Sequence, residues 1–164
     1  MKVKVVTQTL QRVTGTTQYA AGEVISQTAP LSLKFEGMSQ FDGGGFEIRS
    51  ALMMSSANQA TKPDLELWLF SADVVVPADN SAFVPTDAEM ATLVGVIPFP
   101  VASFKVANAG SGADGNISQN VFNVSLSGNS NTLYGVLVVR NTYTPVDSEI
   151  FTAKLQVLHD HQGH

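Results

Sequence analysis

Short stretches of alternating apolar and polar residues, each ended by turn-forming residues, constrain this chain more than any other feature. Alternation with a period of two predicts strands that bury one face. Turns are predicted at Asp42–Gly45, 62–64, 107–116 and 127–131. Eight strands at this spacing predict an all-β fold, an antiparallel β-sandwich of the jelly-roll type. The predicted strands are residues 2–13, 30–36, 45–56, 64–71, 100–107, 117–126, 132–140 and 148–158.

Two of these strands indicate how the sheets are covered. In 64–71 the residues Leu65, Leu67 and Leu69 share one face, which predicts the side toward the core. The run from Tyr134 to Val139 is apolar on both faces. It therefore predicts a central strand, or a strand whose outer face is covered by a loop or by a neighbouring subunit. We expect the row Tyr134, Val136 and Val138 to be left exposed by a lone sandwich.

The longest connection, about 71–99, contains one helix signal. Thr86 precedes Glu89 by three residues, the spacing of a capping box, in which each side chain binds the other residue's backbone N–H. We predict a short helix from Thr86 to Leu93, closed by Gly95. A single non-helical turn is the alternative.

The length of 164 residues predicts one domain without an internal repeat. We divide the chain into an N-terminal strand or arm (1–15), the sandwich (16–158) and a C-terminal tail (159–164). The first segment carries Lys2, Lys4 and Arg12 in an otherwise acidic protein. We expect it to add a strand to a neighbouring subunit's sheet, or to lie along the surface of a larger assembly to which the protein attaches.

Composition excludes several classes of protein. Charged residues make up only 14%, whereas Ser, Thr, Asn and Gln number 15, 13, 9 and 9. A net charge of −5 argues against nucleic acid as a partner. The sequence has no apolar run long enough to span a membrane and no cysteine for a disulfide or a thiolate site. Thr7, Gln8 and Thr9 interrupt the first apolar run, so we expect no signal peptide and synthesis in a cytoplasm.

Catalytic constellations are not evident, and we predict that the protein is not an enzyme. The three histidines all lie in the last six residues, so none is available inside the fold for a catalytic triad or a cupin metal site. The carboxylate pairs Asp64 with Glu66, and Asp87 with Glu89, are interpreted as surface charges and as helix-capping groups. We expect no hydrophobic surroundings that would raise either pair's pKa. No catalytic residue is assigned.

Two segments resemble ligand sites, but we predict neither a cofactor nor a metal. His159, His161 and His164 could hold a metal ion if three tails met on a symmetry axis, but a solvated terminus is the interpretation we adopt. The Gly-rich stretch 108–116 lacks the ending of a phosphate-binding loop. Asp114 and Asn116 in it could ligate calcium, without the spacing of an EF-hand. We predict a loop between strands.

Trp68 is the only tryptophan and lies opposite the leucine row of its strand. Three environments are open for it: packing under a long loop, a subunit contact, or stacking on a sugar ring. The last of these would make the protein a carbohydrate-binding module.

The middle of the chain resembles small virion structural proteins of tailed bacteriophages. The resemblance covers most of residues 17–140 and depends on loose, largely apolar motifs. These are the segment Thr17–Ser26; Gly44–Ile48; the strand Leu65–Phe70 followed by Asp79–Phe83, Thr86–Glu89 and Leu93–Ile97; and Leu133–Val139.

This resemblance implies a β-sandwich without catalytic residues that decorates or cements a capsid, or forms part of a head fibre or tail attachment. The expected protein is a capsid cement or decoration protein, a homotrimer on the outer surface of the virion that binds the major capsid protein and is made in the bacterial host's cytoplasm. Its uncharged polar surface suits packing against copies of itself. The alternative is a carbohydrate-binding or adhesion module of a phage fibre or tail, with a glycan as partner.

Overall fold

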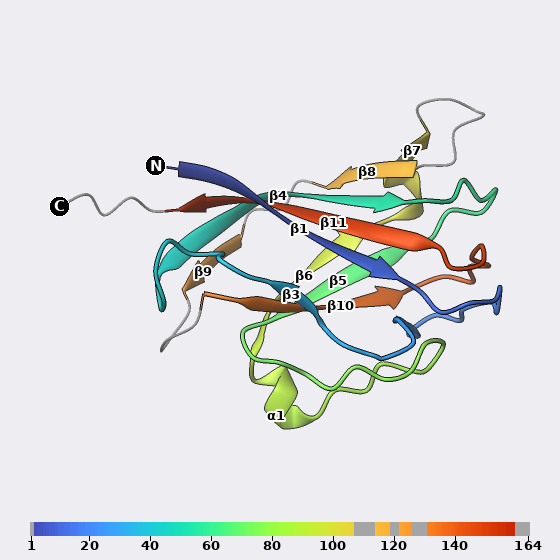
Figure 1. Cartoon of the computed structure of the whole chain (residues 1–164), viewed down its shortest axis with the longest axis horizontal. Coiled ribbons are helices and arrows are strands. Elements are labelled where there is room, and N and C mark those ends of the chain that lie inside the picture. The colour runs from blue at the N-terminus through green and yellow to red at the C-terminus, as the bar shows by residue number, and fades with distance from the viewer. Residues whose placement is uncertain (1, 107–113, 119–121, 126–130, 160–164) are drawn as a thin grey trace.

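The computed structural model describes residues 2–106, 114–118, 122–125 and 131–159. Side chains are described for all of these except 114–118 and 122–125. Strands predominate in the described part of the chain (Figure 1), as the alternating pattern predicts. The elements are β1 (Lys2–Gln11), β2 (Val24–Ile25), β3 (Leu33–Phe35), β4 (Gly45–Ser55), β5 (Leu65–Phe70), α1 (Asp87–Met90), β6 (Leu93–Phe99), the 3-10 turn η1 (Val101–Ser103), β7 (Phe104–Val106), β8 (Asp114–Ser118), β9 (Phe122–Ser125), β10 (Leu133–Val139) and β11 (Ile150–His159).

The strands form two antiparallel sheets that lie one over the other (Figure 1). One sheet has the order β1-β11-β4-β8-β7, with β9 also pairing with β4. The other has the order β2-β10-β5-β6, with β3 sharing the β10 edge with β2. If β2 and β3 are counted as one strand, and β7, β8 and β9 as another, the described chain has eight strands. Numbered one to eight along the chain, the strands follow the order 1-8-3-6 in the first sheet and 2-7-4-5 in the second. These are the strand orders of a jelly roll. The predicted fold class is confirmed.

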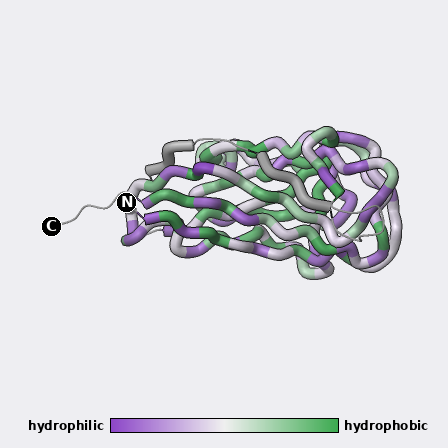
Figure 2. Tube along the Cα trace, turned by 90° about the horizontal axis from the view of Figure 1, so that it is seen from above, coloured by the Kyte–Doolittle hydropathy of each residue, from purple (hydrophilic) through white to green (hydrophobic). Residues whose placement is uncertain are grey.

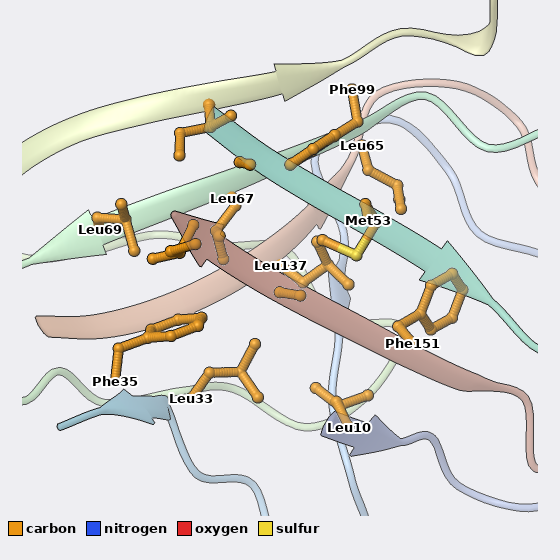
Figure 3. Packing of buried hydrophobic residues seen from close by; sticks show 14 of the residues in the cluster. Leu10, Leu33, Phe35, Met53, Leu65, Leu67, Leu69, Phe99, Leu137 and Phe151 are labelled. Atoms are coloured by element: carbon orange, nitrogen blue, oxygen red, sulfur yellow. The ribbon is translucent and has the colours of Figure 1, made fainter. Parts of the chain in front are cut away.

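The predicted core faces are confirmed as well. Leu65, Leu67 and Leu69 are fully buried between the sheets, where Met53 of β4 and Phe151 of β11 face them (Figure 3). Hydrophobic and hydrophilic residues alternate along the strands (Figure 2). Each buried Leu, Val or Phe stabilises the fold by roughly 1.5–3 kcal/mol.

A second apolar cluster lies on the outer face of the smaller sheet. Val74 of the connection between β5 and β6 packs with Val136 and Val138 of β10 and with Phe70. Trp68, Phe83 and Tyr134 pack against this cluster. The chain's own connection therefore covers the row that we expected to be exposed, and that expectation is wrong. β10 lies between β5 and the edge formed by β2 and β3, and its outer face is covered by the loop, so the central-strand and loop interpretations of Tyr134–Val139 are both confirmed.

Strand boundaries differ from prediction where glycine and proline interrupt the pattern. Residues 93–99 form β6, although Gly95 suggested the end of a helix. Because β6 is an edge strand, the missing N–H of Pro98 is tolerated there. The helix α1 consequently stops at Met90 rather than Leu93. The short β2 was not predicted, and the strands predicted at 30–36 and 100–107 shorten to β3 and to η1 with β7. The strand predicted at 117–126 overlaps the end of β8 at Ser118 and β9 from Phe122, and residues 119–121 lie outside the described residues.

The N-terminal segment is a strand of its own sandwich. β1 pairs with β11 over ten positions, from Lys2 opposite His159 to Gln11 opposite Ile150. Val6 and Leu10 on its inner face are buried in the core. We expected this segment to leave the domain and join a neighbouring subunit's sheet. That expectation is wrong for the side of β1 that pairs with β11 of the same chain. β1 is itself the edge of its sheet.

Candidate functional site

Trp68 lies under the long connection between β5 and β6. The Phe83 ring meets the Trp68 ring edge-on, with 5.6 Å between the centroids. The Arg140 guanidinium lies over the Trp68 ring at 5.8 Å. The first of the three environments considered, packing under a loop, is confirmed. A sugar would have to displace Arg140 or Phe83 to stack on this ring.

The carboxylate pair Asp64 and Glu66 belongs to the same group of side chains. Glu66 Oε2 accepts hydrogen bonds from Trp68 Nε1 at 2.9 Å and from Arg140 Nε at 2.8 Å. Partial burial, followed by the nearby Glu66 charge, raises the pKa of Asp64 above its ordinary value, and Arg140 opposes this. The expectation of unperturbed surface carboxylates is wrong for Asp64. Glu66 holds Trp68 and Arg140 in place.

The second carboxylate pair caps α1, as the sequence predicts. Glu89 N donates to Thr86 Oγ1 at 3.2 Å, and Thr86 N donates to Glu89 Oε2 at 2.7 Å, which completes the capping box. Val75 N also donates to Glu89 Oε1 at 2.7 Å. These hydrogen bonds from Thr86 and Val75 lower the pKa of Glu89. The pair has a structural role in the long connection.

A buried ion pair ties that connection to the N-terminal third of the chain. Arg12 Nη2 and Asp79 Oδ2 are 3.0 Å apart, and their side chains are only 1% and 5% exposed. The Tyr19 hydroxyl donates to Asp79 Oδ1 at 2.6 Å and accepts from Arg12 Nε at 2.9 Å. Burial, followed by the hydrogen bond to Asp79, raises the pKa of Tyr19. Sequence reasoning missed this group, because its members are far apart in the chain and carry no spacing motif.

A second buried carboxylate, Glu149, precedes β11. It is 0% exposed and accepts hydrogen bonds from the hydroxyls of Tyr143, at 2.6 Å, and of Ser55. Val146 N donates to its other oxygen at 3.2 Å. These donors satisfy the carboxylate and fix the turn before β11 against the end of β4. The arrangement is structural rather than reactive.

Of the three histidines, the structure describes His159. His159 is the last residue of β11 and is 5% exposed, so the interpretation of a solvated terminus is wrong for it. His161 and His164 lie outside the described residues. Within the described ranges, no three His, Asp or Glu side chains are grouped so that they could hold a metal ion. Most of the Gly-rich stretch 108–116 also lies outside the described residues, and Asp114 begins β8. Nor does the described part of the chain contain a helix long and apolar enough to cross a membrane.

Two surfaces remain that sequence reasoning did not assign. One is the outward side of β1, β11 and β4, here called the outer sheet face. Val3 and Val5 are 56% and 55% exposed there. Its uncharged residues include Thr7, Thr9, Ser50, Leu52, Met54, Thr152 and Gln156, and its charged residues are Lys154 and the ion pair of Glu47 with Arg49.

The other surface is a cavity of about 320 Å³ at the end of the sandwich, here called the polar corner. It is lined by Lys2, Lys4, Gly37, Ser39, Gln40, Asn131 and His159. The alternation in β1 does show that Lys2 and Lys4 share a face, but only the pairing of β1 with β11 brings them to His159.

Comparison with known proteins gives similarities of fold only. No protein-family model and no curated protein sequence matches the chain. Among solved structures, it is similar to a chain of the cyanophage Pam1 capsid asymmetric unit, at 16% identity and a TM-score of 0.40 over 96% of this chain and 85% of that one. It is similar to a chain of the capsid of Helicobacter pylori bacteriophage KHP30, at 7% identity and a TM-score of 0.39 over 96% and 88%. It is also similar to the PRD1 vertex protein P5, at 10% identity and a TM-score of 0.40 over 95% and 96%. Similarity of this degree does not carry a function from one protein to another.

Proposed function

We propose that the protein is a non-enzymatic structural component of a bacteriophage virion. The observation that carries this proposal is the jelly-roll topology, because this fold is used by viral capsid proteins, lectin domains and cupins. The motifs along residues 17–140 resemble phage virion proteins and agree with the first of these uses. Because one fold serves several functions, the surfaces must decide among them.

The outer sheet face supports a role in assembly. Exposed Val3 and Val5 on paired strands, among uncharged polar side chains, form a surface suited to protein contact. Many copies, each contributing a modest contact across capsomer junctions, would together resist the pressure of packaged DNA. We therefore propose the specific role of a capsid cement or decoration protein on the outer surface, bound to the major capsid protein.

A homotrimer remains part of the proposal, on different grounds from those first given. The row Tyr134, Val136 and Val138 is covered by the chain itself and cannot form the contact. We propose the outer sheet face and the free edge of β1 as the subunit interface instead.

Electron microscopy of the particle, combined with light scattering, tests the proposal. We expect a species three times the 17.4 kDa chain mass at micromolar concentration, and density for the protein at local three-fold positions. Replacing Val3 and Val5 with lysine should prevent attachment without unfolding the sandwich. Val75→Lys is the matched control, because Val75 is 80% exposed on the opposite side of the fold. A monomer that is absent from purified particles would contradict the proposal.

The carbohydrate-binding alternative has its own experiment. Because the Trp68 ring is covered by Arg140 and Phe83, we expect no glycan on an array to depend on it. Binding that is lost in Trp68→Ala, but not in Phe41→Ala, would favour this alternative over a cement protein. Phe41 serves as control because it is an aromatic residue exposed to 54% elsewhere on the surface.

A further inference from the structure

The polar corner is formed where the apolar filling of the sandwich ends. Lys2 and Lys4 continue the inward row of β1 that buries Val6 and Leu10. His159 continues the inward row of β11 after Leu155 and Val157. Cationic and polar side chains thus replace core residues at one end of the space between the sheets.

His159 is buried there with an unused polar atom. Its Nδ1 atom is inaccessible to solvent and has no hydrogen-bond partner, and the residue is 5% exposed. An unsatisfied buried nitrogen of this kind is costly, by about 1–3 kcal/mol. Burial, followed by the charges of Lys4 and Lys2, lowers the pKa of His159. The imidazole is consequently neutral at pH 7, with one N–H to donate and one nitrogen to accept.

Among the described residues, no carboxylate pairs with the cations of the corner, Lys2 and Lys4. Lys4 Nζ donates to the Gly37 carbonyl at 3.0 Å. The other lining side chains, Ser39, Gln40 and Asn131, are uncharged. A protein of net charge −5 therefore holds two ammonium groups against a cavity without a counter-charge from its own described residues.

We propose that the polar corner binds an oxyanion, a phosphate or a carboxylate, between Lys2, Lys4 and His159. The two ammonium groups would supply charge-assisted hydrogen bonds, and a small rotation of the His159 ring would bring its buried Nδ1 to the ligand as an N–H donor. A volume of about 320 Å³ admits a single small anion or the end of one acidic side chain. This inference does not depend on the proposed virion role. Inward-pointing lysines on an edge strand can also have another role, which is to prevent other strands from pairing with that edge. The experiment must therefore distinguish anion binding by Lys2 and Lys4 from this protective role.

The test is a titration of the full chain with sodium phosphate at pH 7 and constant ionic strength, followed by NMR of the histidine ring protons and by calorimetry. We expect saturable shifts in the His159 resonances, identified by their loss in His159→Gln. The double variant Lys2→Gln with Lys4→Gln should weaken binding by about tenfold or more. Lys154→Gln, which changes a lysine on the outer sheet face, is the matched control and should leave binding unchanged.

A second titration uses a short acidic peptide of Asp and Glu in place of phosphate, which distinguishes a free anion from a protein carboxylate as the natural source. Saturable binding of either probe, dependent on Lys2 and Lys4, supports the site. Two results would overturn it: no saturable binding of either probe, or equal weakening by Lys154→Gln, which would show general attraction to positive charge. In both cases, the lysines would be left with their edge-protecting role alone.

Discussion

Individual polar residues determine how the long connection is attached to the sandwich. Asp79 accepts hydrogen bonds from Arg12, Tyr19 and the backbone N–H of Ser26, all within 3.0 Å. Because these groups come from three separated parts of the chain, one carboxylate fixes the connection, the end of β1 and the end of β2 together. At the scale of the residue, the fold therefore depends on a few satisfied buried charges as well as on apolar packing.

Removing the Asp79 carboxylate should strongly destabilise the protein. Asp79→Ala leaves Arg12 buried without its partner, which costs about 3–5 kcal/mol. Chemical denaturation monitored by circular dichroism measures the change. Asp42→Ala, at an exposed position, is the control and should stay within about 0.5 kcal/mol of the parent protein. Equal stability of the two variants would show that the ion pair contributes nothing.

His159 should make stability depend on pH below about 6.5. Its pKa is lowered in the folded state by burial and by Lys4 and Lys2, so the unfolded chain binds a proton more readily. The stabilisation is therefore fully present above the unfolded pKa and is lost as pH falls toward the folded pKa. The melting temperature of the parent should fall relative to that of His159→Gln as the pH is lowered from 7.5 to 5. Parallel curves would contradict the assigned shift.

At the scale of the element, β10 shows how closely side chains of neighbouring strands in one sheet pack over a glycine. A Cβ atom on Gly135 would lie 3.0 Å from Leu67 Cδ1 and 3.0 Å from Phe35 Cε2. These contacts are tighter than most Cβ contacts in proteins, so Leu67 or Phe35 would have to shift by a few tenths of an ångström to admit a side chain here.

Gly135→Ala should accordingly destabilise the sandwich by about 1–3 kcal/mol through overpacking. Phe35→Leu removes part of the obstructing ring, so the double variant should lose less stability than the sum of the single variants. A double-mutant cycle of unfolding free energies measures this coupling. Strict additivity would mean that the added methyl group does not meet the Phe35 ring.

The connection between β5 and β6 behaves as a cover for the smaller sheet. Phe83 contacts both Trp68 and Phe70, at centroid distances of 5.6 and 6.2 Å. Phe83→Ala should lower the free energy of unfolding by about 1–3 kcal/mol and increase the binding of a hydrophobic dye, because it uncovers the outer cluster. Phe41→Ala changes a largely exposed ring and should do neither. Unchanged dye binding in Phe83→Ala would show that the cover stays in place without this ring.

The elements also show what sequence can and cannot predict. The alternation of Leu65, Leu67 and Leu69 identified their buried face correctly, because a strand's two faces follow from its own residues. The capping box of Thr86 and Glu89 was likewise local. β6 was missed because its Pro98 is acceptable only at a sheet edge, and strand order is not visible in a sequence. The polar corner was missed for the same reason, since it depends on the register of β1 against β11.

At the scale of the whole molecule, the sandwich is closed by its first and last strands. β1 pairs only with β11, and it brings Val6, Leu10 and Arg12 into the interior. The N-terminal segment is thus part of the domain's stability, while its outward Val3 and Val5 belong to the surface proposed for assembly. Folding and attachment share this strand, so a deletion cannot separate them and point substitutions are needed.

Deleting residues 1–12 should therefore unfold the protein rather than release a stable core that attaches poorly. Burial of Val6 and Leu10 contributes roughly 1.5–3 kcal/mol each. Loss of Arg12 leaves the Asp79 carboxylate buried without its partner, at a cost of about 3–5 kcal/mol. Together these approach the whole stability of a typical domain, about 5–15 kcal/mol. The deletion variant should lack a cooperative thermal transition and dispersed NMR signals. A chain ending at His159 keeps every β1–β11 pair, so it should melt at the parent temperature, with or without chelator. Cooperative melting of the deletion variant near the parent temperature would instead show that β1 is a detachable arm and that the sandwich closes without it.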